Sequence, residues 1–441
     1  MAWALQKHCA TWRSGRRSNS KLGEIRNVKQ FKTIAVCVAL AFASAGIASA
    51  DEALPIAAPA TGDQDLMQKI KQLEQRVAEL EGKSTQTVMC ASIPGKTLDF
   101  LGQTEISGFA SASYLYNFNG SDPAGRSFDV NHDQFAFNKF KLTLERPLDF
   151  NPTNWAAGYR ADLIFGQDAK LIHSSGFFGG EDVDLEQAFI DFNIPIGNGL
   201  KIIAGKTVTL MGVEVIEETV NPNWSEGNQF LFAENFTQTG VQLAYKWNDK
   251  VDTEFVVFNG WDVVKDNNSG MSFMGRIGIT PDDKTTIGIV GYYGPEQAGD
   301  SSDYRKGINV VINRKITDKF GLWLQGDYGR EDANAALPEP NHSADWWAAG
   351  AWLTYDFCEK LGIALRGDYF DDADGARTSG VLGFPVNTGQ RFSSVTLTLN
   401  IKPVANLQIR PELRWDRSSL GNAFSGHDDQ ITAGVGVAYL Y

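Results

Sequence analysis

The chain has few of the residues on which soluble enzymes and disulfide scaffolds depend. Its 441 residues include four cysteines and five histidines. Cys9 and Cys37 lie in the first 50 residues, and Cys90 and Cys358 are too isolated for a disulfide framework or a metal-binding pattern. The serine-hydrolase, zinc-protease and phosphate-loop motifs are absent as well. The sequence therefore predicts no enzyme, no bound metal and no cofactor.

A long apolar segment is missing too. The apolar run at 33–42 is shorter than the roughly 20 residues that a membrane-spanning helix needs, which excludes a helical inner-membrane protein. The run follows a basic stretch and precedes Ala48-Ser-Ala50, the pattern of a secretory signal peptide. We expect residues 1–50 to form an amino-terminal extension with a signal peptide, and the mature chain to begin at Asp51.

The chain has fewer basic than acidic residues. The formal net charge is -13, and residues 1–50 carry eight Lys/Arg against one Glu, so their removal would leave -20. Nucleic-acid binding requires a basic surface, so a nucleic-acid partner is excluded.

The segment that follows Asp51 divides into three parts. We expect residues 51–62 to form a spacer, 63–82 a short helix and 83–103 a linker. The helix has the heptad seam of a coiled coil, formed by Leu66, Ile70, Leu73, Val77 and Leu80. One interpretation is an amphipathic helix that lies on the protein, and the other is a periplasmic oligomerisation stalk. We favour the stalk, because so short a helix is marginal alone, and expect it to support a homo-oligomer.

Residues 104–441 repeat a pattern of strand, turn, strand and loop. Tight turns such as Trp247-Asn-Asp-Lys250 alternate with longer loops, and this asymmetry is typical of outer-membrane barrels. The pattern predicts an all-β fold, a transmembrane antiparallel up-and-down β-barrel of about 16 strands. The expected strands are 104–117, 132–146, 154–167, 183–194, 199–209, 236–247, 250–260, 271–280, 284–294, 304–316, 319–329, 344–357, 360–370, 389–402, 404–416 and 429–441.

Apolar and charged residues alternate along these strands. The stretch 404–416 places Leu407, Ile409, Leu413 and Trp415 on one face, and Gln408, Arg410, Glu412, Arg414 and Asp416 on the other. An Arg or Lys at the bilayer midplane costs about 2–4 kcal/mol, so the charged face must look into water. We interpret the interior as an aqueous channel; the alternative is a barrel filled by ion pairs. The terminal strand shows the same alternation, with Ile431 and Tyr439 on the lipid face and Thr432 and Ala438 on the lumen face.

The longest connection, 210–235, is the third long loop. It carries five acids and no base: Glu214, Glu217, Glu218, Glu226 and Glu234. If the loop folds inward, these acids face wall charges contributed by Arg160, Lys206, Arg366, Arg410, Glu412 and Arg414, and a constriction with charge of both signs results. The alternative is a solvated acidic loop on the surface.

Several segments carry a resemblance to a known family. Gly205-Lys206-Thr-Val-Thr-Leu-Met-Gly212-Val-Glu214, Gln229-Phe-Leu-Phe232 and Val257-Phe-Asn-Gly-Trp-Asp262 look like the OmpL-like β-barrel porin family. The likeness covers most of 104–441. It implies an outer-membrane porin in which Gly212 and Glu214 belong to a segment that enters the third loop.

The expected function is therefore that of an outer-membrane porin, a water-filled channel for passive diffusion of ions and small hydrophilic solutes. Its partners would be outer-membrane lipid, these solutes and further copies of itself, in a homo-trimer by analogy with porins. A non-conducting adhesin or structural barrel is the main alternative, and an outer-membrane enzyme is a weaker one. Ion conductance in planar bilayers separates a channel from an adhesin.

Overall fold

The computed structural model describes residues 102–177, 182–332 and 342–441. The predicted signal peptide, spacer and coiled-coil helix lie outside these residues. Within them, no helix is long and apolar enough to cross a membrane.

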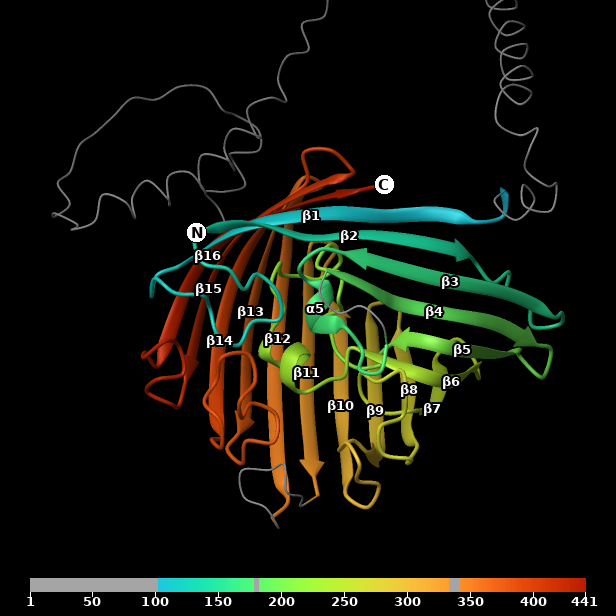
Figure 1. The fold of residues 1–441 in the computed structure, drawn as a ribbon. Helices are drawn as coiled ribbons and strands as arrows, with labels where there is room; N and C mark the ends of the chain where they lie inside the picture. The colour runs from blue at the N-terminus through green and yellow to red at the C-terminus, as the bar shows by residue number, and fades with distance from the viewer. Residues whose placement is uncertain (1–101, 178–181, 333–341) are drawn as a thin grey trace, which may run out of the picture. The chain divides into compact units, whose positions relative to one another are not determined.

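Residues 105–440 form one closed antiparallel barrel of sixteen strands (Figure 1). The first strand pairs with the last, from Phe109 opposite Leu440 to Asn117 opposite Thr432, which closes the sheet. The predicted sixteen strands are confirmed, with ends displaced by at most three residues. The strands are β1 (Glu105–Asn117), β2 (Gln134–Arg146), β3 (Ala156–Phe165), β4 (Val183–Ile194), β5 (Leu200–Val208), β6 (Thr237–Lys246), β7 (Val251–Phe258), β8 (Ser272–Asp282), β9 (Thr285–Pro295), β10 (Tyr304–Lys315), β11 (Phe320–Glu331), β12 (Ala344–Cys358), β13 (Leu361–Asp372), β14 (Gln390–Ile401), β15 (Leu407–Ser418) and β16 (Asp429–Leu440).

The two faces of the wall differ as the alternation predicts. In β15, Leu413 is exposed on the outside while Arg414 is buried on the inside. In β16, Tyr439 is exposed and Ala438 is fully buried. Outward apolar side chains and inward polar ones suit a barrel with lipid outside and polar contents.

One strand departs from this rule. The inward residues of β7 include Val256 and Phe258, which share a face with Glu254. Both apolar side chains are buried in an interior cluster, so the mixed face that the sequence shows at 250–260 has a packing reason. The cluster consists of Met211, Val256, Phe258, Trp261, Met274, Val290 and Tyr292.

Two short helices lie in the long loops that follow β3 and β5. They are α5 (Ala169–Ile172) and α6 (Asn228–Phe232). Every residue of α6 is buried. The connection that contains α6, residues 209–236 and called loop 3 below, therefore runs inside the barrel and not over its surface.

Candidate functional site

Loop 3 turns inward at a narrow neck. The Thr209 amide donates to the Phe236 carbonyl at 3.1 Å, which extends the β5–β6 pairing by one step into the loop. Gly212 then turns the chain with φ +88°, and a Cβ there would overlap the Glu234 carboxylate. Only glycine satisfies both the left-handed backbone and this close approach. Met211 packs beside the neck in the apolar cluster on β7–β9.

Glu214 is the first acid beyond the neck, and its carboxylate is fully engaged. Its Oε1 accepts hydrogen bonds from Arg366 Nη1 at 2.6 Å and from Trp352 Nε1 at 3.0 Å. Its Oε2 accepts from the Gly227 amide at 2.6 Å, so the same carboxylate also joins two parts of loop 3. The Glu214–Arg366 ion pair is buried, and Arg366 Nε also lies 3.2 Å from Asp368 Oδ2, so one buried guanidinium compensates two carboxylates.

The next two acids meet lysines of β2. Lys139 Nζ lies 2.8 Å from Glu218 Oε2 and donates to the Ile216 carbonyl at 2.7 Å. Lys141 pairs with Glu217. Burial alone would raise the pKa of Glu217, but the ammonium group of Lys141 holds that pKa below its ordinary value.

The arginines of β15 bind the loop backbone and not its acids. Arg410 Nη2 donates to the Asn221 carbonyl at 2.7 Å and to the Pro222 carbonyl at 2.6 Å. Arg414 Nη1 donates to the Glu226 carbonyl at 2.6 Å. Glu412 supplies the reverse contact, since its Oε2 accepts from the amides of Trp224 and Ser225 at 2.9 and 3.2 Å.

Glu226 itself has no cation partner among the described residues. Its Oε1 accepts from Asn221 Nδ2 at 3.3 Å. Burial raises the pKa of Glu226 well above its ordinary value; the charge of Lys139 opposes this, and the nearby Glu214 and Glu218 raise the pKa further.

Trp224 occupies a space that β16 leaves open. A Cβ at Gly436 would overlap the Trp224 indole. The indole Nε1 donates to Asp129 Oδ2 at 2.7 Å, which ties loop 3 to the loop between β1 and β2. Gly436 on the lumen face of the last strand thus has a packing role.

The end of loop 3 is aromatic, and the packing of its rings was not predicted from the sequence. The side chains of Phe230, Leu231 and Phe232 on α6 pack into an interior apolar cluster with Phe370 of β13 and Phe392 of β14. The Phe232 ring stacks on that of Phe392 at 5.8 Å between centroids. The sequence contained a signal for this packing. Phe370 lies on the same strand face as Arg366, the face that points into the barrel, and an apolar side chain there needs another apolar group to cover it.

Two predicted wall cations do not join loop 3. Arg160 pairs with Glu145 and Asp162. Lys206 Nζ donates to the Leu185 carbonyl at 2.7 Å and lies 3.3 Å from Asp184 Oδ2. Within the described ranges, neither side chain has a hydrogen bond or ion pair with the loop.

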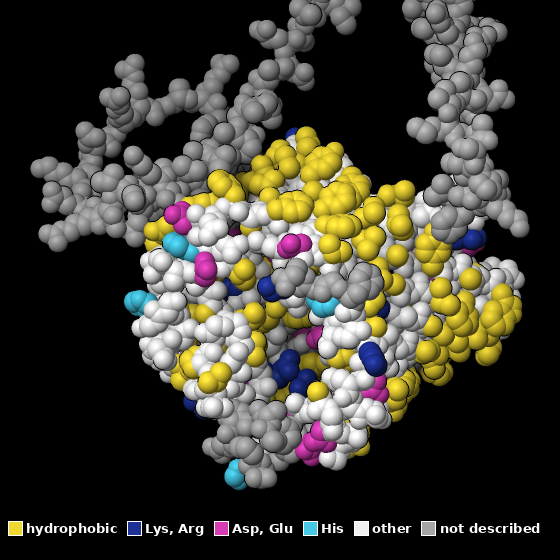
Figure 2. Space-filling view, in the orientation of Figure 1, with side chains coloured by type: hydrophobic (Ala, Val, Ile, Leu, Met, Phe, Trp, Pro, Cys, Tyr) yellow, Lys and Arg dark blue, Asp and Glu magenta, His cyan; other side chains and the backbone are white. Residues whose placement is uncertain are grey.

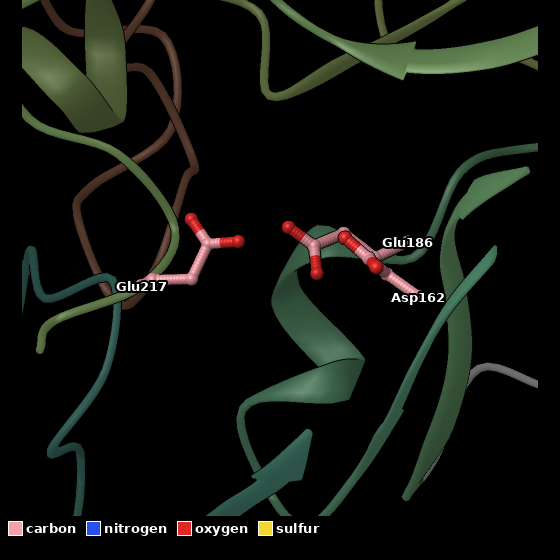
Figure 3. A group of neighbouring side chains, drawn as sticks. All are labelled: Asp162, Glu186 and Glu217. Atoms are coloured by element: carbon pink, nitrogen blue, oxygen red, sulfur yellow. The ribbon is translucent and has the colours of Figure 1, made fainter. Parts of the chain in front are cut away.

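Three carboxylates converge on one point near Lys141. Figure 3 shows Asp162 and Glu186 pointing from the wall toward Glu217 of loop 3. The Lys141 ammonium lies 3.0 Å from Asp162 Oδ2 and 2.8 Å from Glu186 Oε2, and it also contacts Glu217. The protein's own ammonium group therefore supplies the cation that this acidic cluster requires.

Charged side chains in the interior near the short turns are more exposed than those at the level of loop 3. Arg276 bridges Asp252 and Glu254 at 2.5 and 2.8 Å, and all three side chains are partly exposed. Lys201 is likewise partly exposed beside Asp191. The wall thus carries partly exposed charges of both signs away from loop 3.

The face with the long loops is hollowed as well. Figure 2 shows a hollow with Lys and Arg side chains inside it on the face where α5 lies in Figure 1.

A family model described as "Putative beta-barrel porin-2, OmpL-like" matches residues 103–441. The chain belongs to this family. The resemblance that the sequence carries to this family is thereby confirmed. Family and fold together point to a channel and not to an enzyme.

Solved outer-membrane proteins share the fold at low sequence identity. The outer membrane channel DcaP of Acinetobacter baumannii has 12% identity and a TM-score of 0.52, over 77% of this chain and 97% of that one. An anion-selective porin from Comamonas acidovorans has 8% identity and a TM-score of 0.55, over 77% and 99%. OmpT of Vibrio cholerae, in a trimer form, has 10% identity and a TM-score of 0.55, also over 77% and 99%. No curated protein matches the chain.

Proposed function

We propose that the barrel is a general outer-membrane porin through which ions and small hydrophilic solutes diffuse passively, with loop 3 as its constriction. The observation that carries the proposal is the position of loop 3, whose acids and backbone are bound to charged side chains of β2, β13 and β15 inside the barrel. Charges of both signs at this level favour weak ion selectivity.

A second candidate is a barrel that does not conduct. Side chains of the wall such as Lys139, Arg366 and Arg414 are buried against the loop, which leaves little free space beside them. Single-channel recording of the full chain in planar bilayers separates the two functions. Steady conductance in KCl supports the porin, and silence at every protein concentration supports an adhesin or structural barrel.

Selectivity tests whether loop 3 is the constriction. Replacement of Glu214, Glu217 and Glu218 together by Gln removes three negative charges and leaves Arg366 and Lys139 with one acid each, Asp368 and Asp168. The reversal potential should shift toward anions. An unchanged reversal potential with normal conductance would place the ion path away from the loop.

The matched control removes three acids from the short turns. Asp249, Asp283 and Asp318 are exposed, so their replacement by Asn makes the same change in total charge outside the proposed constriction. Because exposed charges are screened within about 8–10 Å at physiological salt, this variant should keep the parent reversal potential.

The proposal includes two statements about the amino-terminal part. We expect cleavage before Asp51, which amino-terminal sequencing of outer-membrane material tests, and retention of 31–50 would contradict it. We also expect a homo-trimer that a periplasmic stalk at 63–82 supports, with its seam at the five heptad positions named above. Native mass measurement of the chain with and without 63–82 tests this, and an unchanged mass would remove the stalk from the account.

A further inference from the structure

Two arginines share a pair of tryptophan rings at the long-loop end of the barrel. Arg305 is the second residue of β10, and Arg377 lies in the loop between β13 and β14. The Cζ of Arg305 lies 4.8 Å from the ring centroid of Trp261 and 6.0 Å from that of Trp346. For Arg377 the two distances are 5.2 and 5.7 Å. All four fall within the roughly 6 Å over which a guanidinium is attracted to a ring face.

The sheet beneath the arginines has room for these rings. Tyr292, Gly307, Gly329 and Trp346 are successive partners in the register of β9, β10, β11 and β12. A Cβ at Gly307 would overlap the Tyr292 hydroxyl, and a Cβ at Gly329 would overlap the Trp346 indole. The two glycines therefore let both aromatic side chains lie flat on the wall, and Trp261 packs edge-on against Tyr292.

One acid pairs directly with these arginines in the described ranges, and the others nearby are bonded to different groups. Glu331 Oε2 accepts from Arg305 Nε at 2.6 Å. Glu296 accepts instead from the Trp261 amide at 2.6 Å and from the Ser272 hydroxyl at 2.7 Å.

Asp372 is likewise occupied by its own loop. Its Oδ2 accepts from the amides of Arg377 and Thr378 at 2.9 and 2.8 Å. Asp372 therefore shapes the backbone of the β13–β14 loop and leaves the Arg377 guanidinium without an ion pair in the described part of the chain.

The terminal nitrogens of both guanidinium groups are free of protein acceptors. Arg377 donates through Nε to the Phe232 carbonyl of loop 3 at 2.7 Å. Across the described ranges, none of the four Nη atoms of Arg305 and Arg377 has a hydrogen-bond partner, and none is enclosed. Burial and the adjacent Arg305 lower the pKa of Arg377 to about 10, as expected where two like charges meet without enough counter-charge.

We propose that Arg305 and Arg377 form a binding site for the carboxylate group of small organic anions in the mouth of the barrel, directly above loop 3. The planar donors of guanidinium match a carboxylate in geometry and charge, and the surrounding rings limit competition from water. The site would concentrate such solutes at the constriction. In this sense the inference rests on the proposed porin function and names a class of solute for it.

The test is a titration of the detergent-solubilised full chain with sodium benzoate at constant ionic strength, followed by tryptophan fluorescence. Saturable binding is expected, and Arg377→Gln should weaken it tenfold or more, the loss typical of a hydrogen bond between charged groups. Arg391→Gln is the matched control, because it removes one positive charge from an exposed site at the same end of β14. It should change the affinity less than twofold.

A second variant separates binding from the attachment of loop 3, because Arg377 also contacts Phe232. Arg305→Gln combined with Glu331→Gln removes the other guanidinium, leaves no unpaired acid and does not touch loop 3. It should also weaken binding tenfold. Equal affinity in all variants, absence of saturation, or tighter binding of inorganic phosphate than of benzoate would overturn the carboxylate site.

Bilayer recordings in KCl keep this result distinct from the porin proposal. Benzoate binding by a barrel that does not conduct would reject the porin function and leave the anion site. Conductance without benzoate binding would do the reverse.

Discussion

Loop 3 consists of two halves that are held inside the same barrel by different interactions. Residues 214–226 are acidic, and their contacts are ion pairs and charged hydrogen bonds to β2, β13 and β15. Residues 228–232 form α6, whose aromatic side chains pack on phenylalanines of β13 and β14. Both halves are buried inside the barrel. The inner face of the wall is therefore charged where it contacts residues 214–226 and apolar where it contacts α6.

The two kinds of contact contribute differently to the position of loop 3 and to the stability of its packing. A buried ion pair recovers little more than the cost of removing its charges from water, yet it is very sensitive to the loss of one partner. Apolar burial is less directional and stabilises in proportion to the area removed from water. We infer that the acidic half fixes where loop 3 lies and that α6 supplies much of the free energy that keeps it there.

The largest expected effect comes from breaking the acidic half at Arg366. Arg366→Met leaves Glu214 buried without its cation, which should cost about 3–5 kcal/mol in the free energy of unfolding. Denaturant titration of the detergent-solubilised barrel measures this. Asp368 Oδ2 also lies 3.2 Å from Arg366 Nε, so the rescue is the triple variant with Glu214→Leu and Asp368→Asn, which removes all three charges and should recover most of the loss. Equal destabilisation in the single and triple variants would mean that the three charges do not compensate one another as described.

Breaking the aromatic half should cost somewhat less. Phe232→Ala deletes a fully buried ring and should lower the free energy of unfolding by about 3 kcal/mol. The loss should not depend on salt, because no charge is removed. Phe140→Ala is the control, since this ring is partly exposed on the outer face. A salt-dependent loss for Phe232→Ala would show that the two halves are not independent.

The barrel was largely predictable because its signal repeats. Sixteen strands each alternate apolar and polar residues, and errors at single ends do not alter the count. The site was predictable only where it is charged. Glu214 and Arg366 were both named from the sequence, and the structure brings them together at 2.6 Å.

The remaining features depend on contacts between distant segments. The sequence does not reveal that Arg410 binds carbonyl groups of loop 3, because backbone acceptors are present everywhere along a chain. It also does not reveal that Gly436 receives Trp224, which lies more than two hundred residues away in the chain. Such pairings follow from the closed topology and become visible only with it.

A smaller loss of stability is expected from a change in β16, where Gly436 contacts Trp224 of the acidic half. Gly436→Ala places a methyl group on the Trp224 indole and should cost about 1–3 kcal/mol through overpacking. Gly367→Ala is the matched control, since a Cβ there meets nothing within 4 Å. Trp224→Phe should relieve part of the loss in the Gly436→Ala background. Equal effects of the two glycine variants would remove Trp224 from this position.

The smallest effect concerns Asp168, at the boundary between the two kinds of packing. Its Oδ2 lies 3.5 Å from Lys139 Nζ, and Lys139 in turn lies 4.0 Å from the centroid of the Phe128 ring in the apolar cluster. Burial raises the pKa of Asp168 from 3.8 to about 7, against the opposing effect of Lys139. Between these two values the folded state retains a proton that the unfolded state has lost.

Stability contributed by this group should therefore fall as the pH rises from about 4 to 7. Asp168→Asn removes the titration, so the variant should gain stability relative to the parent as the pH rises from 5 to 8. Unfolding midpoints of the parent and the variant at the two pH values measure the difference. A gain of the same size at both pH values would show that Asp168 stays ionised throughout. Asp168 would then act as an ion-pair partner of Lys139, as Glu218 of loop 3 does.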